Sequence, residues 1–152
     1  MKLIKTKEDN LEENYLELHY DRIDEETKAV LDRLRDTLRY IEGTYEDRKV
    51  TIALTDIFYI ETVDRKTFAY TKDMCFEIKE ALRDILEEYS NIGFARISKS
   101  SIVNIYKIKK FQGDINMRVI IFLKNDEKLI MNRSYKNEFY DRLKKLQGRK
   151  AK

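Results

Sequence analysis

Three short segments of the sequence combine a long cationic side chain with hydroxyl or amide groups. They are segments 64–67, 98–101 and 132–136, which read Asp-Arg-Lys-Thr, Ser-Lys-Ser-Ser and Asn-Arg-Ser-Tyr-Lys. Arg and Lys side chains can reach guanine O6 and N7, Asn can pair with adenine, and Ser and Thr hydroxyls can bond phosphate. This chemistry suits contact with nucleic acid, although any one segment alone is typical of an ordinary polar turn.

Groups that could perform catalysis are sparse. His19 lies among acidic residues without a Ser or Cys nucleophile near it in sequence, and we expect Cys75 to pack as a small hydrophobic residue. One Cys cannot form an internal disulfide, and one Cys with one His cannot form a zinc site. The sequence contains no glycine-rich phosphate loop, HExxH or GxSxG motif. We therefore expect neither an enzyme, a cofactor nor a small-molecule substrate.

Charge is distributed unevenly along the chain. The 31 Lys and Arg and 28 Asp and Glu residues give a net charge of only +3. Residues 1–47 nevertheless carry a net −6, residues 48–91 a net −2 and residues 92–152 a net +11. A strongly basic part predicts a polyanionic partner, because Lys and Arg supply the sequence-independent part of nucleic-acid binding. The alternative is that many of these cations only cover a solvated helix.

The first part of the chain predicts two strands and a helix. Residues 3–6 and 15–19 have strand character, and the second segment alternates between polar and apolar residues. Asp24 fits a helix N-cap, and Gly43 fits the C-terminal stop. Between them, one helical face carries Val30, Leu31, Leu34, Leu38 and Ile41.

After Arg48 the pattern changes to short strands. Strands are predicted at 49–54, 57–62 and 67–71, with 74–78 as a candidate further strand and a hairpin of residues 115–123 and 128–131. The segment 98–101 stands between the run 94–97 and the apolar pair 102–103. One helix is predicted from the spacing of Ile78, Leu82, Ile85, Leu86 and Tyr89, and a last helix from about Ser134. The three basic segments therefore fall between these elements, in loops. Loops on a rigid scaffold often carry function.

Several motifs in this region occur in the order and spacing of a known family. They are the runs 57–61 (IFYIE), 65–67 (RKT), 93–100 (GFARISKS), 102–104 (IVN) and 131–135 (MNRSY). These motifs resemble the LytTR family, the DNA-binding output domain of many bacterial response regulators. The resemblance covers about residues 48–146 and rests mainly on the third motif together with the late Asn-Arg-x-Tyr.

The resemblance implies a mostly β fold with flanking helices, a sandwich of short antiparallel strands. It also implies that loops, rather than a recognition helix, enter the major grooves of double-stranded DNA. By motif alignment, the base contacts would come from Lys66 or Thr67, Lys99 and Arg133. The candidates for phosphate contacts are Arg65, Ser98, Ser100, Asn132, Tyr135 and Lys136. Arg96 and Asn104 match the motif but are expected to brace the loop.

The N-terminal part departs from the family's best-known arrangement. Only 47 residues precede the match, which is too short for a receiver domain, so the chain is similar to the stand-alone LytTR type. We expect residues 1–47 to form a strand–strand–helix extension for dimerisation or regulation, 48–148 the DNA-binding domain, and 149–152 a frayed tail. The extension could contact a second copy or a regulatory membrane protein, or simply pack on its own domain.

These observations predict a bacterial transcriptional regulator that binds DNA as a homodimer. The sequence has no signal peptide and no apolar run near 20 residues, so we expect a cytoplasmic location. Two alternatives remain open at this point. One is a β module for single-stranded nucleic acid or RNA, with aromatic residues as stacking platforms. The other is a protein-interaction module with no nucleic-acid partner.

Overall fold

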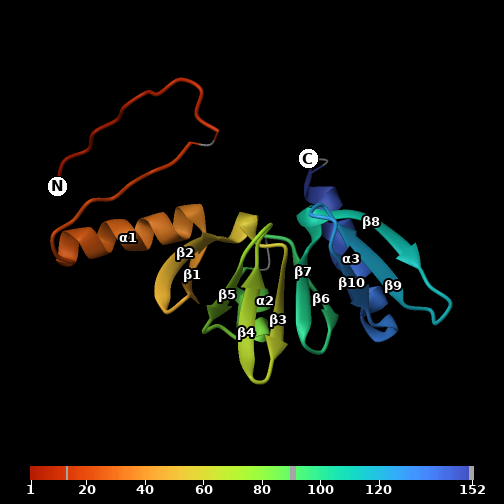
Figure 1. Ribbon diagram of the computed structural model, residues 1–152. Helices are drawn as coiled ribbons and strands as arrows, with labels where there is room; N and C mark the ends of the chain where they lie inside the picture. The colour runs from red at the N-terminus through yellow and green to blue at the C-terminus, as the bar shows by residue number, and fades with distance from the viewer. Residues whose placement is uncertain (13, 90–91, 151–152) are drawn as a thin grey trace. The chain divides into compact units, whose positions relative to one another are not determined.

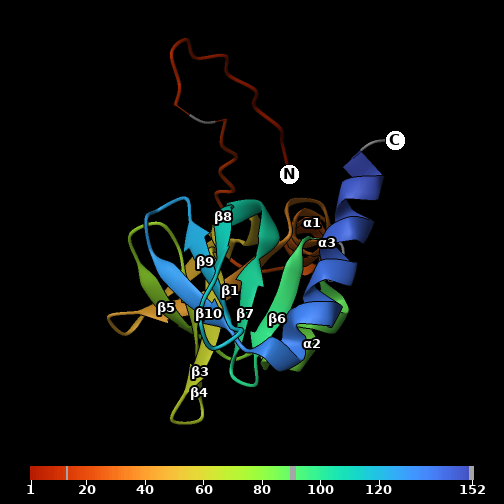
Figure 2. The same ribbon diagram turned by 90° about the vertical axis from the view of Figure 1, so that its right-hand side faces the viewer.

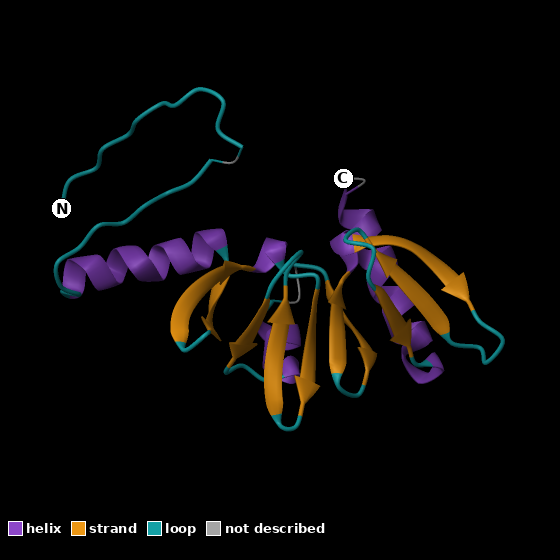
Figure 3. Cartoon of the chain, in the orientation of Figure 1, coloured by secondary structure: helices purple, strands orange, loops and turns teal. Residues whose placement is uncertain are grey.

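The chain divides into two compact units. The structure is a computed structural model that describes residues 1–12, 14–89 and 92–150. The first unit is Met1–Arg39 and the second is Tyr40–Lys152. Each unit is described here by itself. Figure 1 shows the course of the chain, and Figure 3 distinguishes its helices, strands and loops.

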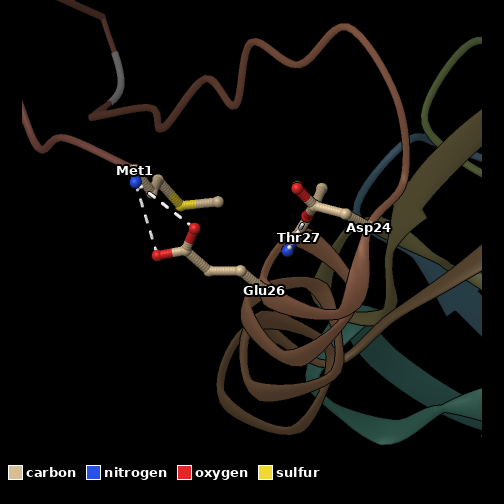
Figure 4. A network of polar contacts seen from close by, with 4 residues as sticks. All are labelled: Met1, Asp24, Glu26 and Thr27. Carbon is tan, nitrogen blue, oxygen red and sulfur yellow. Dashed lines mark hydrogen bonds and ion pairs between the residues drawn. The ribbon is translucent and has the colours of Figure 1, made fainter.

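The first unit contains the helix α1 (Glu25–Leu38). Asp24 caps its N-terminus as predicted, because Asp24 Oδ1 accepts a 2.8 Å hydrogen bond from the Thr27 backbone N–H. This bond holds the pKa of Asp24 below its ordinary value. Figure 4 shows the cap together with the Met1 ammonium, which lies 3.3 Å from Oε2 of Glu26.

The two strands predicted before this helix are wrong. The described residues before Asp24 contain neither helix nor strand, so segments 3–6 and 15–19 are not strands. An isolated pair of strands needs a hydrophobic face to pack on before it is stable. The apolar residues here stay largely exposed, for example Leu3 at 83% and Tyr15 at 63%.

The helix also ends earlier than predicted. Its C-cap is Arg39, which adopts the left-handed conformation at φ 50°, and its N–H donates to Arg35 O. Gly43 instead lies inside β1 (Tyr40–Tyr45), which pairs with β2 (Arg48–Ala53) across the turn Glu46-Asp47. Ile41 therefore belongs to the sheet, although its spacing from Leu38 fits a helical face.

The second unit is built from two antiparallel sheets. Its seven-stranded sheet has the order β2-β1-β5-β4-β3-β7-β6, and its three-stranded sheet the order β10-β9-β8. Besides β1 and β2, the strands are β3 (Tyr59–Val63), β4 (Lys66–Tyr70), β5 (Cys75–Ile78), β6 (Phe94–Ser98), β7 (Ser101–Asn104), β8 (Ile108–Gly113), β9 (Val119–Leu123) and β10 (Lys128–Met131). The helices are α2 (Leu82–Glu88) and α3 (Lys136–Lys150), with the short 3-10 turn η3 (Arg133–Tyr135) before α3.

Alternate residues of β6 and β7 enter two separate hydrophobic cores. Ile102 and Phe94 join the core that α2 covers, while Val103 and Ala95 join a second core. The second core also contains Val119 and other residues of the three-stranded sheet and of α3. The β6–β7 end of the large sheet is thus packed on both faces, which fixes the register of this hairpin. This packing makes it a rigid support for the turn between the two strands.

The predicted fold class is confirmed: the unit is mostly antiparallel β with flanking helices. Some boundaries differ from the prediction. Ile78 belongs to β5 rather than to the following helix, and strand β8 was not predicted. Helix α3 continues to Lys150 where a frayed tail was expected, and residues 151–152 lie outside the described residues.

Candidate nucleic-acid interface

The three basic segments meet at one end of the second unit. The β3–β4 turn, the β6–β7 turn and the segment after β10 all lie at the lower end of this unit in Figures 1 and 2. Two backbone hydrogen bonds join them: Thr62 N–H donates to Ser100 O at 2.8 Å, and Asn132 N–H donates to Ile97 O at 2.9 Å. Segments far apart in sequence therefore form one surface, which we call the loop end.

The first loop is a two-residue hairpin turn. Asp64 and Arg65 both have positive φ, 49° and 66°, as a type I′ turn requires. Lys66 opens β4 with an exposed side chain, while Thr67 is only 9% exposed. Thr67 Oγ1 lies 3.4 Å from Thr62 Oγ1, so its hydroxyl is occupied within the sheet. Of the two base-contact candidates in this loop, the geometry favours Lys66.

The second loop presents Lys99 and Ser100, and a set of internal bonds braces it. Arg96 Nη1 donates to Lys99 O at 2.7 Å, and Ser98 Oγ lies 2.6 Å from Ser101 Oγ. Ser98 Oγ also accepts a 3.2 Å bond from Ser100 N–H. The expected bracing role of Arg96 is confirmed, and Ser98 shares that role.

Asn104 has the expected structural role as well. It is 2% exposed, and its Nδ2 donates to Ile57 O at 2.9 Å. Its Oδ1 accepts a hydrogen bond from Tyr106 N–H at 3.1 Å. Asn104 thereby ties the end of β7 to the segment before β3, which stabilises the support of the first two loops.

The third loop is the start of η3. Asn132 caps it, because Asn132 Oδ1 accepts bonds from Ser134 N–H at 3.1 Å and from Ser134 Oγ at 3.0 Å. Arg133 and Lys136 are exposed, and Tyr135 packs partly buried against the second core. Both bonds of Asn132 use its carbonyl oxygen, so its Nδ2 donors are not engaged in the cap.

The cations of the loop end keep their charge uncompensated. Within the part of the chain that the structure describes, no carboxylate lies within 4.0 Å of the charged atoms of the following residues: Arg65, Lys66, Lys99, Arg133 and Lys136. All five residues are exposed. Unpaired cations on one surface create a positive potential that attracts polyanions.

One further loop borders this surface and was missed by the sequence reasoning. Asn116 and Arg118, from the β8–β9 connection, line an open hollow together with Ser98, Asn132 and Arg133. The sequence prediction extended a strand over residues 115–123 and so hid this turn. The run Gly113-Asp114 followed by Asn116 is typical of a turn and could have revealed it.

Outside the loop end, the described residues offer no candidate metal site and no thiol with a lowered pKa. Residues 1–12, 14–89 and 92–150 contain no group of three or more His, Cys, Asp and Glu side chains that could hold a metal ion. Cys75 is exposed, so the expectation that it packs as a small hydrophobic residue is wrong. The local surroundings of the Cys75 thiol raise its pKa, chiefly by desolvation, which disfavours a reactive thiolate. No described helix has the length and apolar character to cross a membrane.

An antiparallel β unit that gathers unpaired cations on braced loops has the basic surface typical of a nucleic-acid-binding module. The chain belongs to the LytTr DNA-binding domain family, whose match covers residues 47–144. The predicted resemblance is therefore confirmed.

The chain is also similar to individual proteins of known sequence or structure. It is 26% identical to an uncharacterized HTH-type transcriptional regulator of Staphylococcus aureus strain bovine RF122 / ET3-1, over 88% of this chain and 92% of the relative. The corresponding regulator of strain NCTC 8325 / PS 47 matches with the same identity and coverage. A solved LytTr DNA-binding domain from Bacillus cereus matches the fold with a TM-score of 0.64 and 22% identity, over 68% of this chain and 95% of that chain.

Proposed function

We propose that this chain is a transcriptional regulator that recognises specific sequences in double-stranded DNA with the loops of its second unit. The observation that carries the proposal is the loop end, where three separate basic segments are joined by two backbone hydrogen bonds. The family match and the relatives named as transcriptional regulators support it. A two-stranded β ribbon fits the major groove of B-DNA, which is about 12 Å wide.

In this proposal, the loops divide the work between bases and backbone. Lys66, Lys99 and Arg133 contact base edges, because each is exposed and each comes from a different loop. Thr67 is the weaker candidate since the residue is only 9% exposed. The proposed phosphate contacts are Arg65, Ser98, Ser100, Asn132, Tyr135 and Lys136. For Asn132, the free Nδ2 donors supply that contact.

We further propose that two copies bind together and that the first unit mediates their association or their regulation. Among the described residues before α1, eight large hydrophobic residues are exposed, and their side chains are available for contact with a partner. They are Met1, Leu3, Ile4, Leu11, Tyr15, Leu16, Tyr20 and Ile23. A second copy of the chain is the proposed partner, and a regulatory membrane protein is the alternative.

Selection from a random duplex pool, followed by fluorescence anisotropy at two salt concentrations, tests the proposal. The selected duplex should bind saturably and with lower affinity at higher salt, because phosphate contacts release counterions. Arg133→Ala and Lys99→Ala should each weaken binding by about 1–3 kcal/mol and relax the preference at one base pair. The matched control is Lys144→Ala, which removes an exposed cation from α3.

Three outcomes would contradict the proposal. Absence of saturable binding to any duplex would exclude DNA binding. Single strands that outcompete the duplex would favour a single-strand module. Equal losses on selected and random DNA for Arg133→Ala would show that the loops contribute charge without reading sequence.

A further inference from the structure

The β8–β9 connection lies beside the third loop because of strand register. Val119, the first residue of β9, pairs with Met131, the last residue of β10. Arg118 and Asn132 are the next residues outward on each strand, so they lie at the same end of the small sheet. The Asn132 N–H bond to Ile97 O brings the end of β6 to this place as well. The loop of residues 114–118 thus extends the loop end.

This loop lines a hollow of about 430 Å³ together with residues of the second and third loops. Its lining contains two guanidinium groups, two amides and one hydroxyl, besides one apolar side chain. The lining residues are Ser98, Asn116, Arg118, Ile130, Asn132 and Arg133. The nitrogen atoms of guanidinium and amide side chains donate hydrogen bonds and accept none. This lining therefore suits an oxygen-rich anion.

Asp114 positions Arg118. Its Oδ1 accepts backbone bonds from Asn116 N–H at 2.9 Å and Arg118 N–H at 3.0 Å. Its Oδ2 binds Arg118 Nε at 3.0 Å and Nη2 at 2.9 Å. Partial burial acts to raise the pKa of Asp114, but these donors outweigh it and hold the pKa below its ordinary value. The carboxylate therefore stays ionised and fixes the guanidinium plane.

The geometry leaves Arg118 able to bind a second acceptor. The Asp114 carboxylate occupies Nε and Nη2, so the two N–H donors of Nη1 are not used by this pair. The Arg118 side chain is 44% exposed, and it lines the hollow together with Arg133. A guanidinium held by a carboxylate loses little side-chain entropy when it binds a ligand.

We propose that the β8–β9 connection is a fourth DNA-contacting element, in which Arg118 donates from Nη1 to a phosphate oxygen of the DNA backbone. Asn116 and Asn132 flank the same phosphate. This inference rests on the proposed function and adds a backbone contact from an element outside the three basic segments. Asp114 acts as a positioning residue that holds Arg118 toward the hollow.

The slope of log affinity against log salt concentration tests this contact on the selected duplex. Arg118→Ala should lower the slope by about 0.9, the value for one phosphate on B-DNA. It should also weaken binding about tenfold on selected and random duplexes alike, because a lost bond to a charged group has this order of effect. Arg118→Lys keeps the charge but not the two-point bond to Asp114, so it should restore most of the slope and only part of the affinity.

The matched control is Lys124→Ala, which removes one exposed cation at the opposite end of β9. It should leave both slope and affinity close to those of the unmodified chain. Far-UV circular dichroism and urea unfolding of each variant separate loss of contact from loss of fold. Phosphate-ethylation interference gives an independent readout. Ethylation of one particular phosphate should weaken DNA binding by the unmodified chain but should not change DNA binding by Arg118→Ala.

The outcomes separate this inference from the proposed function. If Arg118→Ala behaves like Lys124→Ala while Arg133→Ala loses sequence preference, the fourth contact is wrong and the proposed function stands. If Arg118→Ala relaxes sequence preference with an unchanged slope, the residue reads a base, and the phosphate contact is wrong. If the unmodified chain binds no duplex, the proposed function itself fails.

Discussion

At the scale of single residues, the loop end separates side chains that are free to contact a ligand from those that hold the loops. Lys99 is exposed, whereas Arg96, three residues earlier in the same motif, is bound to Lys99 O. The resemblance to the LytTR family implied both roles. It left Lys66 and Thr67 undecided, although Thr67 and the fully buried Ala69 are two residues apart on one strand face. Because side chains alternate between the two faces of a strand, Lys66 lies on the face opposite Thr67 and Ala69. This favours Lys66 as the base contact.

Arg65 combines a strained backbone position with a proposed contact. Its φ of 66° is the left-handed conformation that glycine adopts without cost, and Asp-Gly is a preferred pair for this turn. Arg65→Gly should therefore raise the free energy of unfolding by about 0.5–1 kcal/mol. The same change should weaken DNA binding and lower its salt slope by about 1, since one phosphate contact is lost.

The β1–β2 turn provides the control for this substitution. Asp47 occupies the equivalent second position of a two-residue turn, with φ 62°. Asp47→Gly should stabilise the chain similarly in urea unfolding but should not weaken DNA binding. If both variants bind DNA as well as the unmodified chain, Arg65 makes no contact.

At the scale of elements, the sequence pattern indicated most of the strands but missed β1 and β8. Strands β3, β4 and β5 follow from short apolar alternation bounded by polar turns, whereas β6 and β7 were marked only by the run 94–97 and the apolar pair 102–103. Strand β1 was missed because Ile41 continues the helical spacing of Leu38, and only the pairing with β2 shows that it belongs to a hairpin. Strand β8 was missed because consecutive lysines interrupt it and its register shifts between Ile108 and Lys110.

Gly43 shows what the sheet requires at a position that the sequence assigned to a helix end. A Cβ at this residue would lie 2.8 Å from Ile52 Cδ1, 3.1 Å from Phe76 Cβ and 3.2 Å from Glu77 O. The Ile52 methyl can move, but the other two atoms belong to the packed sheet. Gly43→Ala should therefore destabilise the chain by about 1–3 kcal/mol, as overpacking does.

Urea unfolding with Gly113→Ala as the control checks this expectation. Gly113 is also a strand glycine, but a Cβ there would meet no atom within 4 Å. Gly113→Ala should leave the unfolding midpoint unchanged or raise it slightly, because alanine restricts the unfolded chain. Equal midpoints for the two variants would contradict the close packing described for Gly43.

At the scale of the whole molecule, the division into two units gives a different charge for each part of the chain than the sequence segments did. The first unit carries 8 Lys and Arg against 11 Asp and Glu, a net −3, and the second carries 23 against 17, a net +6. The contrast is smaller than the sequence segments suggested, because the acidic residues of the β1–β2 hairpin belong to the second unit. Net charge therefore supports binding to a polyanion, and the unpaired cations make the loop end the proposed place of that binding.

A chain of residues 40–152 tests which unit binds DNA and which mediates self-association. It should unfold cooperatively, because both hydrophobic cores lie within these residues. It should bind random duplex more tightly at low salt than the full chain does, since a net −3 has been removed. By sedimentation it should be a monomer if the first unit mediates self-association. A dimer of this shorter chain would place the contact between copies in the second unit.

The hydrogen bonds that join the three loops have a consequence for how relatives diverge. Thr62 and Asn132 donate through backbone N–H groups to backbone carbonyls, so any residue other than proline at these positions preserves both bonds. Side chains at the loop tips can then be exchanged while the spacing between tips stays constant. If the loop tips contact bases as proposed, the distance between the contacted bases is fixed while their identity varies. Target sites of diverged relatives should therefore differ in the contacted bases but keep the same number of base pairs between them.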